Sequence, residues 1–314
     1  MNKYIVNFFI FLLASLKLSA QHSIYAGLCY NKSSTNLGVM RLENDSLISL
    51  GWKNLPVNYI VAEQNTIYVS AGTSTLKSLD GGLTWREFTD WHITSVNAIY
   101  PVSNSNTTFL ATENGVWKTE DDLTWQSKNT GLKPTSQTFI KCLLFPTAHM
   151  DTLIAGTADG LLISTNSGNE WRALALQGKE INCIVQSPFN KNIILVAAEN
   201  SGIFISYDKG LTWKKNVKAL ENKTIYCIAF DKKNKELFYC GGYKTGLYSI
   251  TNSGDQVTAI GNQTNTIILS LFVHQEKDEL IFGTFKEGLW KYDWKTQNPK
   301  CILKDCTVKS ITSN

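Results

Sequence analysis

Three carboxylates are the residues of this chain whose type and spacing could support chemistry. Glu113, Asp159 and Glu199 each follow a short apolar run that ends in small residues, at matching places in three successive repeats. Equivalent loops of a repeat protein gather on one face, so we expect an acidic arc beside a central channel. Two such carboxylates could serve as the acid and the base or nucleophile of a glycosidase, or all three could hold a cation. Solvated loop charge is the simplest interpretation, and we favour it.

The same loops, together with those that join successive repeats, supply candidates for binding. The aromatic and basic side chains expected on this ligand face are Trp91, Tyr243, Lys244, Phe285 and Lys286. These side chains are candidates for contact with a partner protein or a glycan.

Other catalytic frameworks find no support in the sequence. The histidines stand in different repeats, at His22, His92, His149 and His274. No Gly-x-Ser-x-Gly frame and no glycine-rich phosphate loop accompanies them. Neither Cys-x-x-Cys nor a cysteine and histidine pair at ligand spacing occurs. We expect neither a metal site nor a cofactor.

The cysteines have a structural interpretation. Cys142, Cys183 and Cys227 occupy the same place in successive predicted strands, where a compact apolar side chain near a crowded axis is expected. Cys301 and Cys306 could form a disulfide with each other, or one of them could pair with Cys29, in a compartment that permits disulfides.

A repeated octapeptide, Ser-x-Asp-x-Gly-x-Thr-Trp, organises the chain. Its complete copies are Ser78, Asp80, Gly82, Thr84 and Trp85, and Ser206, Asp208, Gly210, Thr212 and Trp213. Degenerate copies contain Asn166, Gly168 and Trp171, and, one residue short, Asp121 and Trp125. An Asp or Asn that accepts backbone hydrogen bonds, followed by Gly, is typical of a tight turn. The Thr would begin a new strand, and the Trp would bury a large ring.

This motif resembles the Asp-box, or BNR, repeat of sialidases, other glycosidases, sortilin-type receptors and photosystem assembly factors. The resemblance implies a β-propeller with the boxes on its rim. For a sialidase it also implies three arginines on the inner face that clamp a carboxylate. Arg41, Arg86 and Arg172, the only arginines, fall in predicted outer strands, and lysine cannot replace a bidentate guanidinium there. We therefore do not expect sialidase chemistry.

Strand patterns repeat from Val57 onward with a period of about 42 residues, as in propeller blades. Each unit contains four short strands and no helical pattern. Six whole units begin near Val57, Val96, Ile140, Ile181, Ile225 and Ile268. The segments 23–42 and 308–312 supply the missing strands of a seventh. The sequence thus predicts an all-β, single seven-bladed propeller, closed by a blade shared between the N- and C-termini.

The first twenty residues predict a secretory signal. Lys3 precedes the apolar run from Ile5 to Leu16, and small residues end at Ala20. The predicted division is therefore a signal peptide over 1–20 and the propeller over 21–314. The formal charge of +4 loses Lys3 and Lys17 on cleavage, which leaves about +2 and gives no nucleic-acid signature. We expect a secreted or periplasmic protein with no membrane span after cleavage.

Two functional hypotheses remain. The first is a non-catalytic interaction or assembly scaffold, for which the photosystem assembly factors offer a precedent by resemblance. The second is a glycoside hydrolase or carbohydrate-binding propeller that uses the acidic arc. We favour the scaffold because folding accounts for every repeated residue.

Overall fold

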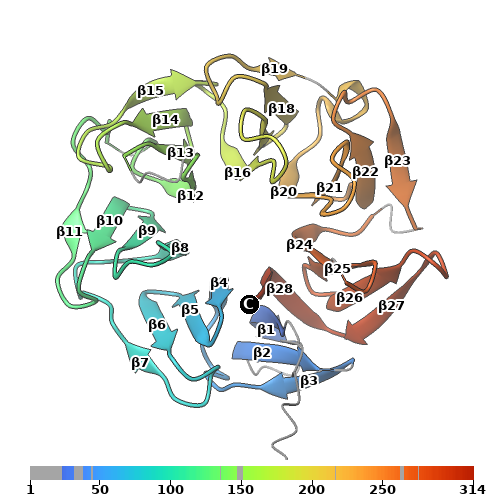
Figure 1. Cartoon of the computed structure of the whole chain (residues 1–314), viewed down its shortest axis with the longest axis horizontal. Coiled ribbons are helices and arrows are strands. Elements are labelled where there is room, and N and C mark those ends of the chain that lie inside the picture. Colours follow the sequence, from blue (N-terminus) through green and yellow to red (C-terminus); the bar gives the residue numbers. More distant parts are fainter. Residues whose placement is uncertain are drawn as a thin grey trace, which may run out of the picture.

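Seven four-stranded antiparallel sheets form a closed ring (Figure 1). The computed structural model describes residues 23–31, 38–43, 45–134, 136–146, 151–215, 217–261, 265–274 and 276–314 of the 314. This is the predicted seven-bladed β-propeller. The predicted signal peptide, 1–20, lies outside the described residues.

The strands run outward from the channel within each blade. Blade 1 consists of β4 (Val57–Glu63), β5 (Thr66–Ala71), β6 (Ser74–Ser78) and β7 (Arg86–Glu87), and blade 2 of β8 (Val96–Pro101), β9 (Thr108–Thr112), β10 (Gly115–Thr119) and β11 (Gln126–Ser127). Blade 3 consists of β12 (Ile140–Leu144), β13 (Leu153–Thr157), β14 (Gly160–Ser164) and β15 (Arg172–Ala175), and blade 4 of β16 (Ile181–Gln186), β17 (Ile194–Ala198), β18 (Gly202–Ser206) and β19 (Lys214–Lys215).

The remaining blades follow the same order. Blade 5 consists of β20 (Ile225–Phe230), β21 (Leu237–Gly242), β22 (Leu247–Thr251) and β23 (Val257–Ile260), and blade 6 of β24 (Ile268–His274), β25 (Glu279–Thr284), β26 (Leu289–Asp293) and β27 (Asn298–Leu303). Blade 7 consists of β28 (Cys306–Ser313), β1 (Ile24–Asn31), β2 (Gly38–Glu43) and β3 (Ser46–Ser49). A 3₁₀ helix, η1 (Lys218–Leu220), joins blades 4 and 5.

Blade 7 closes the ring in the predicted way, with β28 as its inner strand beside β1 (Figure 1). The backbone N–H of Ser23 donates to Asn314 Oδ1 at 2.7 Å, and the N–H of Asn314 donates to the Ser23 carbonyl at 3.2 Å. Asn314 also reaches blade 1, since its Nδ2 donates to the Gln64 carbonyl. The closure therefore pairs strand edges that would otherwise be exposed.

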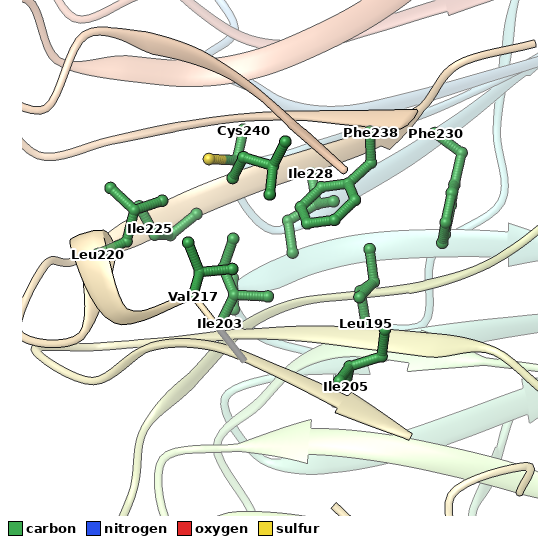
Figure 2. Packing of buried hydrophobic residues seen from close by; sticks show 12 residues of the cluster. Leu195, Ile203, Ile205, Val217, Leu220, Ile225, Ile228, Phe230, Phe238 and Cys240 are labelled. Atoms are coloured by element: carbon green, nitrogen blue, oxygen red, sulfur yellow. The ribbon is translucent and has the colours of Figure 1, made fainter. Parts of the chain in front are cut away.

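Apolar side chains fill the spaces between blades because the second strand of most blades is buried on both faces. Figure 2 shows one such layer, in which Leu195 and Ile205 of blade 4 face Ile228 and Phe238 of blade 5. Leu220 of η1 closes one end of the layer. Burying a side chain such as Phe238 completely contributes about 1.5–3 kcal/mol, and the same packing recurs around the ring.

The Asp boxes are turn staples, as predicted. In blade 4 the Ser206 hydroxyl donates to Asp208 Oδ1 at 2.7 Å and accepts the Gly210 N–H at 2.7 Å. Asp208 also accepts the Thr212 N–H and hydroxyl, at 2.8 and 2.6 Å. The fourth strand, β19, begins only after Trp213, so the expectation that the Thr begins this strand is wrong. The carboxylate holds the Thr in the turn instead.

Box tryptophans also join neighbouring blades. Trp85 Nε1 donates to the Leu50 carbonyl of blade 7 at 3.0 Å, and Trp125 Nε1 donates to the Phe88 carbonyl after β7 at 2.7 Å. Trp171 Nε1 donates to the Lys128 carbonyl after β11 at 2.8 Å. Three boxes thus attach their blade to the preceding one.

One irregularity recurs on every inner strand. The pairing with the second strand skips one residue, which directly follows a fully buried Val or Ile, namely Asn58, Asn97, Lys141, Asn182, Tyr226, Leu269 and Lys309. Such a β-bulge re-aims the side chain of the skipped residue. We call these seven residues the collar, because several of them line the mouth of the central channel.

Helical structure is almost absent from the described ranges, and none of it combines the length and the hydropathy of a membrane-spanning helix.

Candidate functional site

The ring has two chemically different faces. The Asp boxes and the loops between first and second strands form one, which we call the box face. The loops between second and third strands and those between blades form the other, the loop face. Trp91, Tyr243 and Phe285 lie on the loop face with 84%, 49% and 44% of their surface exposed. Rings of this size are costly to leave in water, so they make the loop face a candidate binding surface, although the box face also exposes apolar side chains such as Leu83 and Phe189.

The predicted acidic residues are anchored separately in their own blades. Glu113 is exposed, and its backbone N–H donates to the Ser95 carbonyl. Asp159 Oδ1 accepts the Gly178 N–H at 2.8 Å. Within the described part of the chain, no group of three His, Cys, Asp or Glu side chains could hold a metal ion. The structure thus places these carboxylates on the predicted face without gathering them into a cation site there.

Glu199 is the most constrained carboxylate of the three. Its Oε1 accepts the Thr224 hydroxyl at 3.0 Å, and its Oε2 accepts Asn182 Nδ2 at 3.0 Å. Both oxygens are therefore engaged with the protein. Each oxygen accepts one hydrogen bond and keeps a second lone pair, so these bonds fix the orientation of the carboxylate.

The collar was missed by sequence reasoning. Asn58, Asn97 and Asn182 each donate from Nδ2 to the carbonyl that begins the next inner strand, at 3.0, 2.8 and 3.0 Å. The signal was the asparagine directly after the first residue of these strands, as in Val96-Asn97 and Ile181-Asn182. These amides act as staples between blades.

Two lysines complete the polar part of the collar. Lys141 Nζ donates to Asn182 Oδ1 at 2.6 Å and pairs with Glu180. Lys309 Nζ donates to Asn58 Oδ1 at 2.9 Å. The mouth of the channel over blades 1–4 is therefore a hydrogen-bonded polar rim.

Below the collar, the channel forms a cavity of about 430 Å³. Tyr59 and Tyr100 lie in it with ring centroids 5.6 Å apart. Burial raises the pKa of Tyr59 to about 12. Burial likewise raises the pKa of Cys183 to about 11 and holds that of Cys142 well above its usual value. These groups stay protonated near neutrality, so the thiols are poor nucleophiles and serve as compact fillers.

All seven cysteines have free thiols. Cys301 pairs across the sheet with Trp290, and Trp290 packs toward blade 5. Cys306 belongs to the core between blades 6 and 7. Neither the Cys301–Cys306 disulfide considered from the sequence nor a disulfide of either residue with Cys29 is formed in the structure.

Aromatic and basic residues form repeated pairs on blades 5 and 6. Lys244 Nζ lies 5.4 Å from the centroid of the Tyr243 ring, and Lys286 Nζ lies 5.0 Å from that of Phe285. Both lysines have positive φ, 50° and 68°. This left-handed turn sends each lysine back over the preceding ring, where cation–π attraction stabilises it.

Trp91 stands apart, on the loop between blades 1 and 2. Its ring contacts the His92 ring with centroids 3.4 Å apart, and His92 Nδ1 lies 2.6 Å from Asp90 Oδ1. Hydrogen bonds from His92 lower the pKa of Asp90. This loop adds a second aromatic anchor to the same face.

The arginines lie away from the channel, as expected. Arg86 is on β7, Arg172 is on β15 and Arg41 is on β2. Arg86 pairs with Asp122 and Arg41 with Glu43. No arginine of the described residues lines the channel, so the carboxylate clamp of a sialidase has no counterpart in this part of the chain.

Comparison with known proteins supports the assignment of the repeat. The Sortilin-Vps10 family model (sortilin, neurotensin receptor 3) matches residues 159–298. The matched segment contains the Asp boxes at 164–171 and 206–213, blades 4 and 5, and the first three strands of blade 6. No protein with a curated description matches the chain.

Several solved propellers are similar in structure. The GH74 enzyme of Niastella koreensis is 18% identical with a TM-score of 0.68 over 94% of this chain, which spans about half (52%) of the enzyme's length. A protein of Bacteroides fragilis, described provisionally as a 6-phosphogluconolactonase, is 12% identical with a TM-score of 0.68, covering 95% of this chain and 99% of its own. YCF48 bound to a D1 peptide is 12% identical with a TM-score of 0.62, covering 84% and 85%.

At such identities these likenesses establish the fold alone. The box geometry and the family-model match over residues 159–298 support the description of the chain as a seven-bladed β-propeller with Asp-box (BNR) repeats, similar to sortilin-type proteins.

Proposed function

We propose that this propeller is exported and acts as a non-catalytic interaction or assembly scaffold, in the cell envelope or outside the cell. The ligand is a protein partner bound on the loop face through Trp91, Tyr243 and Phe285. YCF48, a propeller of similar size, has been solved with a D1 peptide, which is a structural precedent for a single propeller that binds a polypeptide.

One contrast on the loop face carries this proposal. The three most exposed aromatic rings of this face are solvent-accessible, whereas both oxygens of Glu199 are bound by Thr224 and Asn182. Partner-binding surfaces commonly present aromatic anchors, and an enzyme would need a carboxylate directed at substrate. Exposed Glu113 is also available to an incoming molecule, but the larger exposed area of this face is that of the three aromatic rings, which suits a binding surface.

A second candidate is a glycan-binding or glycan-cleaving propeller. It is favoured by Trp91, 84% exposed, since a flat aromatic ring can stack on a sugar, and by the likeness to a GH74 enzyme. Glu113 and Asp159 would then contribute carboxylates, in a catalytic geometry that needs a defined separation between them.

The proposal is tested by affinity capture from an envelope extract with the full chain. The test variant replaces Trp91, Tyr243 and Phe285 with Ser. Its matched control replaces three similarly exposed side chains of the box face with Ser, namely Leu83, Leu123 and Leu211. One stoichiometric protein captured by the wild type and the control, and lost with the test variant, supports the scaffold.

Capture of no protein, combined with hydrolysis of a polysaccharide that Glu113→Gln and Asp159→Asn abolish, would overturn the scaffold in favour of the enzyme. Export is tested separately. The full chain, expressed in a bacterial host, should be recovered outside the cytoplasm with Gln21 as its first residue. Recovery from the cytoplasm with residues 1–20 attached would contradict the export proposal.

A further inference from the structure

The chain contains one Asn-Gly dipeptide, Asn114-Gly115. It lies on the loop face, where Asn114 is exposed in the turn between β9 and β10. The backbone nitrogen of the residue after an asparagine can attack the side-chain amide, which is then lost as ammonia. A following glycine hinders this attack least, because it has no Cβ and the widest backbone freedom. Asn114 is therefore the asparagine of this chain whose neighbour most favours deamidation.

The fold requires this glycine. Gly115 has a φ of 111°, and a Cβ atom at this position would lie 2.0 Å from Asn129 Oδ1. A backbone with such a φ favours glycine, and the Asn129 side chain leaves no room for a larger residue. The turn itself therefore fixes the residue that can attack Asn114.

The Asn129 side chain contacts the peptide groups on either side of Gly115. Its Nδ2 donates to the Asn114 carbonyl at 2.8 Å, and its Oδ1 accepts the Val116 N–H at 2.9 Å. When the Gly115 nitrogen loses its proton, the negative charge is shared with the Asn114 carbonyl oxygen of the same peptide group. A hydrogen-bond donor on that oxygen stabilises the anion. The Asn129 amide therefore favours the form of the nitrogen that attacks Asn114.

An aspartate fits the same turn. Blade 3 carries Asp159 at the place of Asn114, and the two turns share a hydrogen bond. The backbone N–H of Asn114 donates to the Thr112 hydroxyl at 3.1 Å, and that of Asp159 donates to the Thr157 hydroxyl at 2.9 Å. Asn114 Nδ2 donates to the Thr94 hydroxyl at 2.5 Å, and this hydroxyl can donate its own proton to a carboxylate instead.

We propose that Asn114 deamidates in the folded protein and so adds a negative charge to the loop face. The Gly115 nitrogen gives its proton to hydroxide and attacks Cγ of Asn114. An N–Cγ bond forms, the Cγ–Nδ2 bond breaks, and Nδ2 leaves as ammonia after taking a proton from water. Water then opens the resulting succinimide at either carbonyl, which gives aspartate or isoaspartate and needs no oxidant or reductant.

The test incubates the folded full chain below its melting transition, at several pH values above neutrality. Peptide mapping by mass spectrometry measures the deamidation of each asparagine. The matched control is Asn200, which is exposed in the corresponding loop of blade 4 and is followed by Ser201. We expect Asn114 to react at least about tenfold faster than Asn200, because Ser201 carries a Cβ, and faster as pH rises. Equal rates at the two asparagines would overturn the proposal.

The variant Asn129→Asp tests how the turn assists the reaction. It keeps an oxygen for the Val116 N–H and removes the donor to the Asn114 carbonyl. If the donor stabilises the anion, Asn114 should deamidate about tenfold more slowly in this variant. If Asn129 only holds the turn closed, its replacement should loosen the turn and speed the reaction. An unchanged or faster rate in the folded variant, as judged by its melting temperature, would overturn the role of Asn129.

The variant Asn114→Asp supplies one product of the reaction directly. It should melt at the wild-type temperature, as expected from Asp159 in the equivalent turn of blade 3. A clearly lower melting temperature would show that this turn does not accept the added charge. The inference goes beyond the proposed scaffold and does not rest on it, because peptide mapping needs no partner. Failure of the capture experiment would therefore leave the modification of Asn114 standing, and the reverse also holds.

Discussion

The Asp boxes of blades 4 and 2 perform the same task with different chemistry. In blade 4, Asp208 and Ser206 hold every turn of the box by local hydrogen bonds. The box of blade 2 is one residue short and has no glycine. Its Asp121 accepts the Thr119 hydroxyl at 3.1 Å and the Leu123 and Thr124 N–H groups at 2.9 and 2.7 Å. The shortened turn sends the next residue, Asp122, inward with φ of 59°.

Asp122 gives blade 2 a link that the complete boxes lack. Its Oδ2 accepts Lys77 Nζ of blade 1 at 2.7 Å and also pairs with Arg86. The carboxylate and the lysine side chain are only 7% and 9% exposed. The comparison shows that a shortened box can keep most of its local turn bonds and add a buried ion pair between blades.

The largest effect is expected from Asp122→Ala. Removing the carboxylate leaves the Lys77 ammonium buried without its partner, and breaking a buried pair costs about 3–5 kcal/mol. Urea denaturation would measure this loss in the free energy of unfolding. The double variant Asp122→Leu with Lys77→Met should recover most of it, since an apolar pair can replace a buried ion pair. A loss below about 1 kcal/mol for the single variant would show that the ion pair does not stabilise the fold.

A smaller effect is expected where a box tryptophan joins two blades. Trp125→Phe keeps a ring in the core and removes the bond from Nε1 to the Phe88 carbonyl, which should cost about 1–3 kcal/mol. Trp213 Nε1 donates within its own box, to Gly210, so Trp213→Phe should cost less in the same thermal-melting series. Equal losses would mean that the bond between blades adds nothing to the ring.

Acid should weaken the complete boxes in a defined range. Hydrogen bonds from Thr84 and Thr212 lower the pKa of Asp80 and Asp208 from 3.8 to about 2. A carboxyl with a lowered folded pKa stabilises the fold above its unfolded pKa, and this contribution is lost as pH falls from about 4 to about 2. Asp80→Asn and Asp208→Asn should flatten the fall in melting temperature over this range. An unchanged slope in the double variant would contradict the local turn bonds.

The smallest effect is expected from the exposed leucines of the boxes. Leu83 and Leu123 are 81% and 79% exposed, although one belongs to a complete box and the other to the shortened one. Leu83→Ser and Leu123→Ser should each change stability by no more than about 0.5 kcal/mol. A larger change at Leu123 alone would indicate that the shortened box depends on this side chain.

Sequence patterns predicted much of the fold because turns and buried strands depend on residues that are close together in the sequence. The box repeats and the apolar runs mark turns and buried strands, so the number of blades and the shared closure followed from them. The link through Asp122 could not be predicted, because it depends on a turn shortened by one residue and on partners in another blade. The expected start of the fourth strand was wrong because the box carboxylate competes with the strand for the Thr N–H.

The candidate site was less accessible to sequence reasoning. Trp91, Tyr243 and Phe285 were found because loop position in a repeat fold predicts the face. The hydrogen bonds from Thr224 and Asn182 to Glu199 were not predicted, because they depend on side-chain positions that a sequence pattern does not give. The collar was also missed, although its asparagines recur at one strand position, because no residue type is shared by all seven blades.

The hydrogen bonds between Ser23 and Asn314 have a consequence for the order of the chain. In a chain that begins at Ser23, a short linker could therefore join Ser23 to Asn314, and exposed loops are where new ends are tolerated. A circular permutant opened at the loop between blades 2 and 3 would then have seven blades that are each formed by one continuous stretch of chain. If the only role of the shared blade is to close the ring, such a permutant should fold and keep its loop face. The free energy of unfolding would then depend on how many blade edges are paired, and not on which loop contains the chain ends.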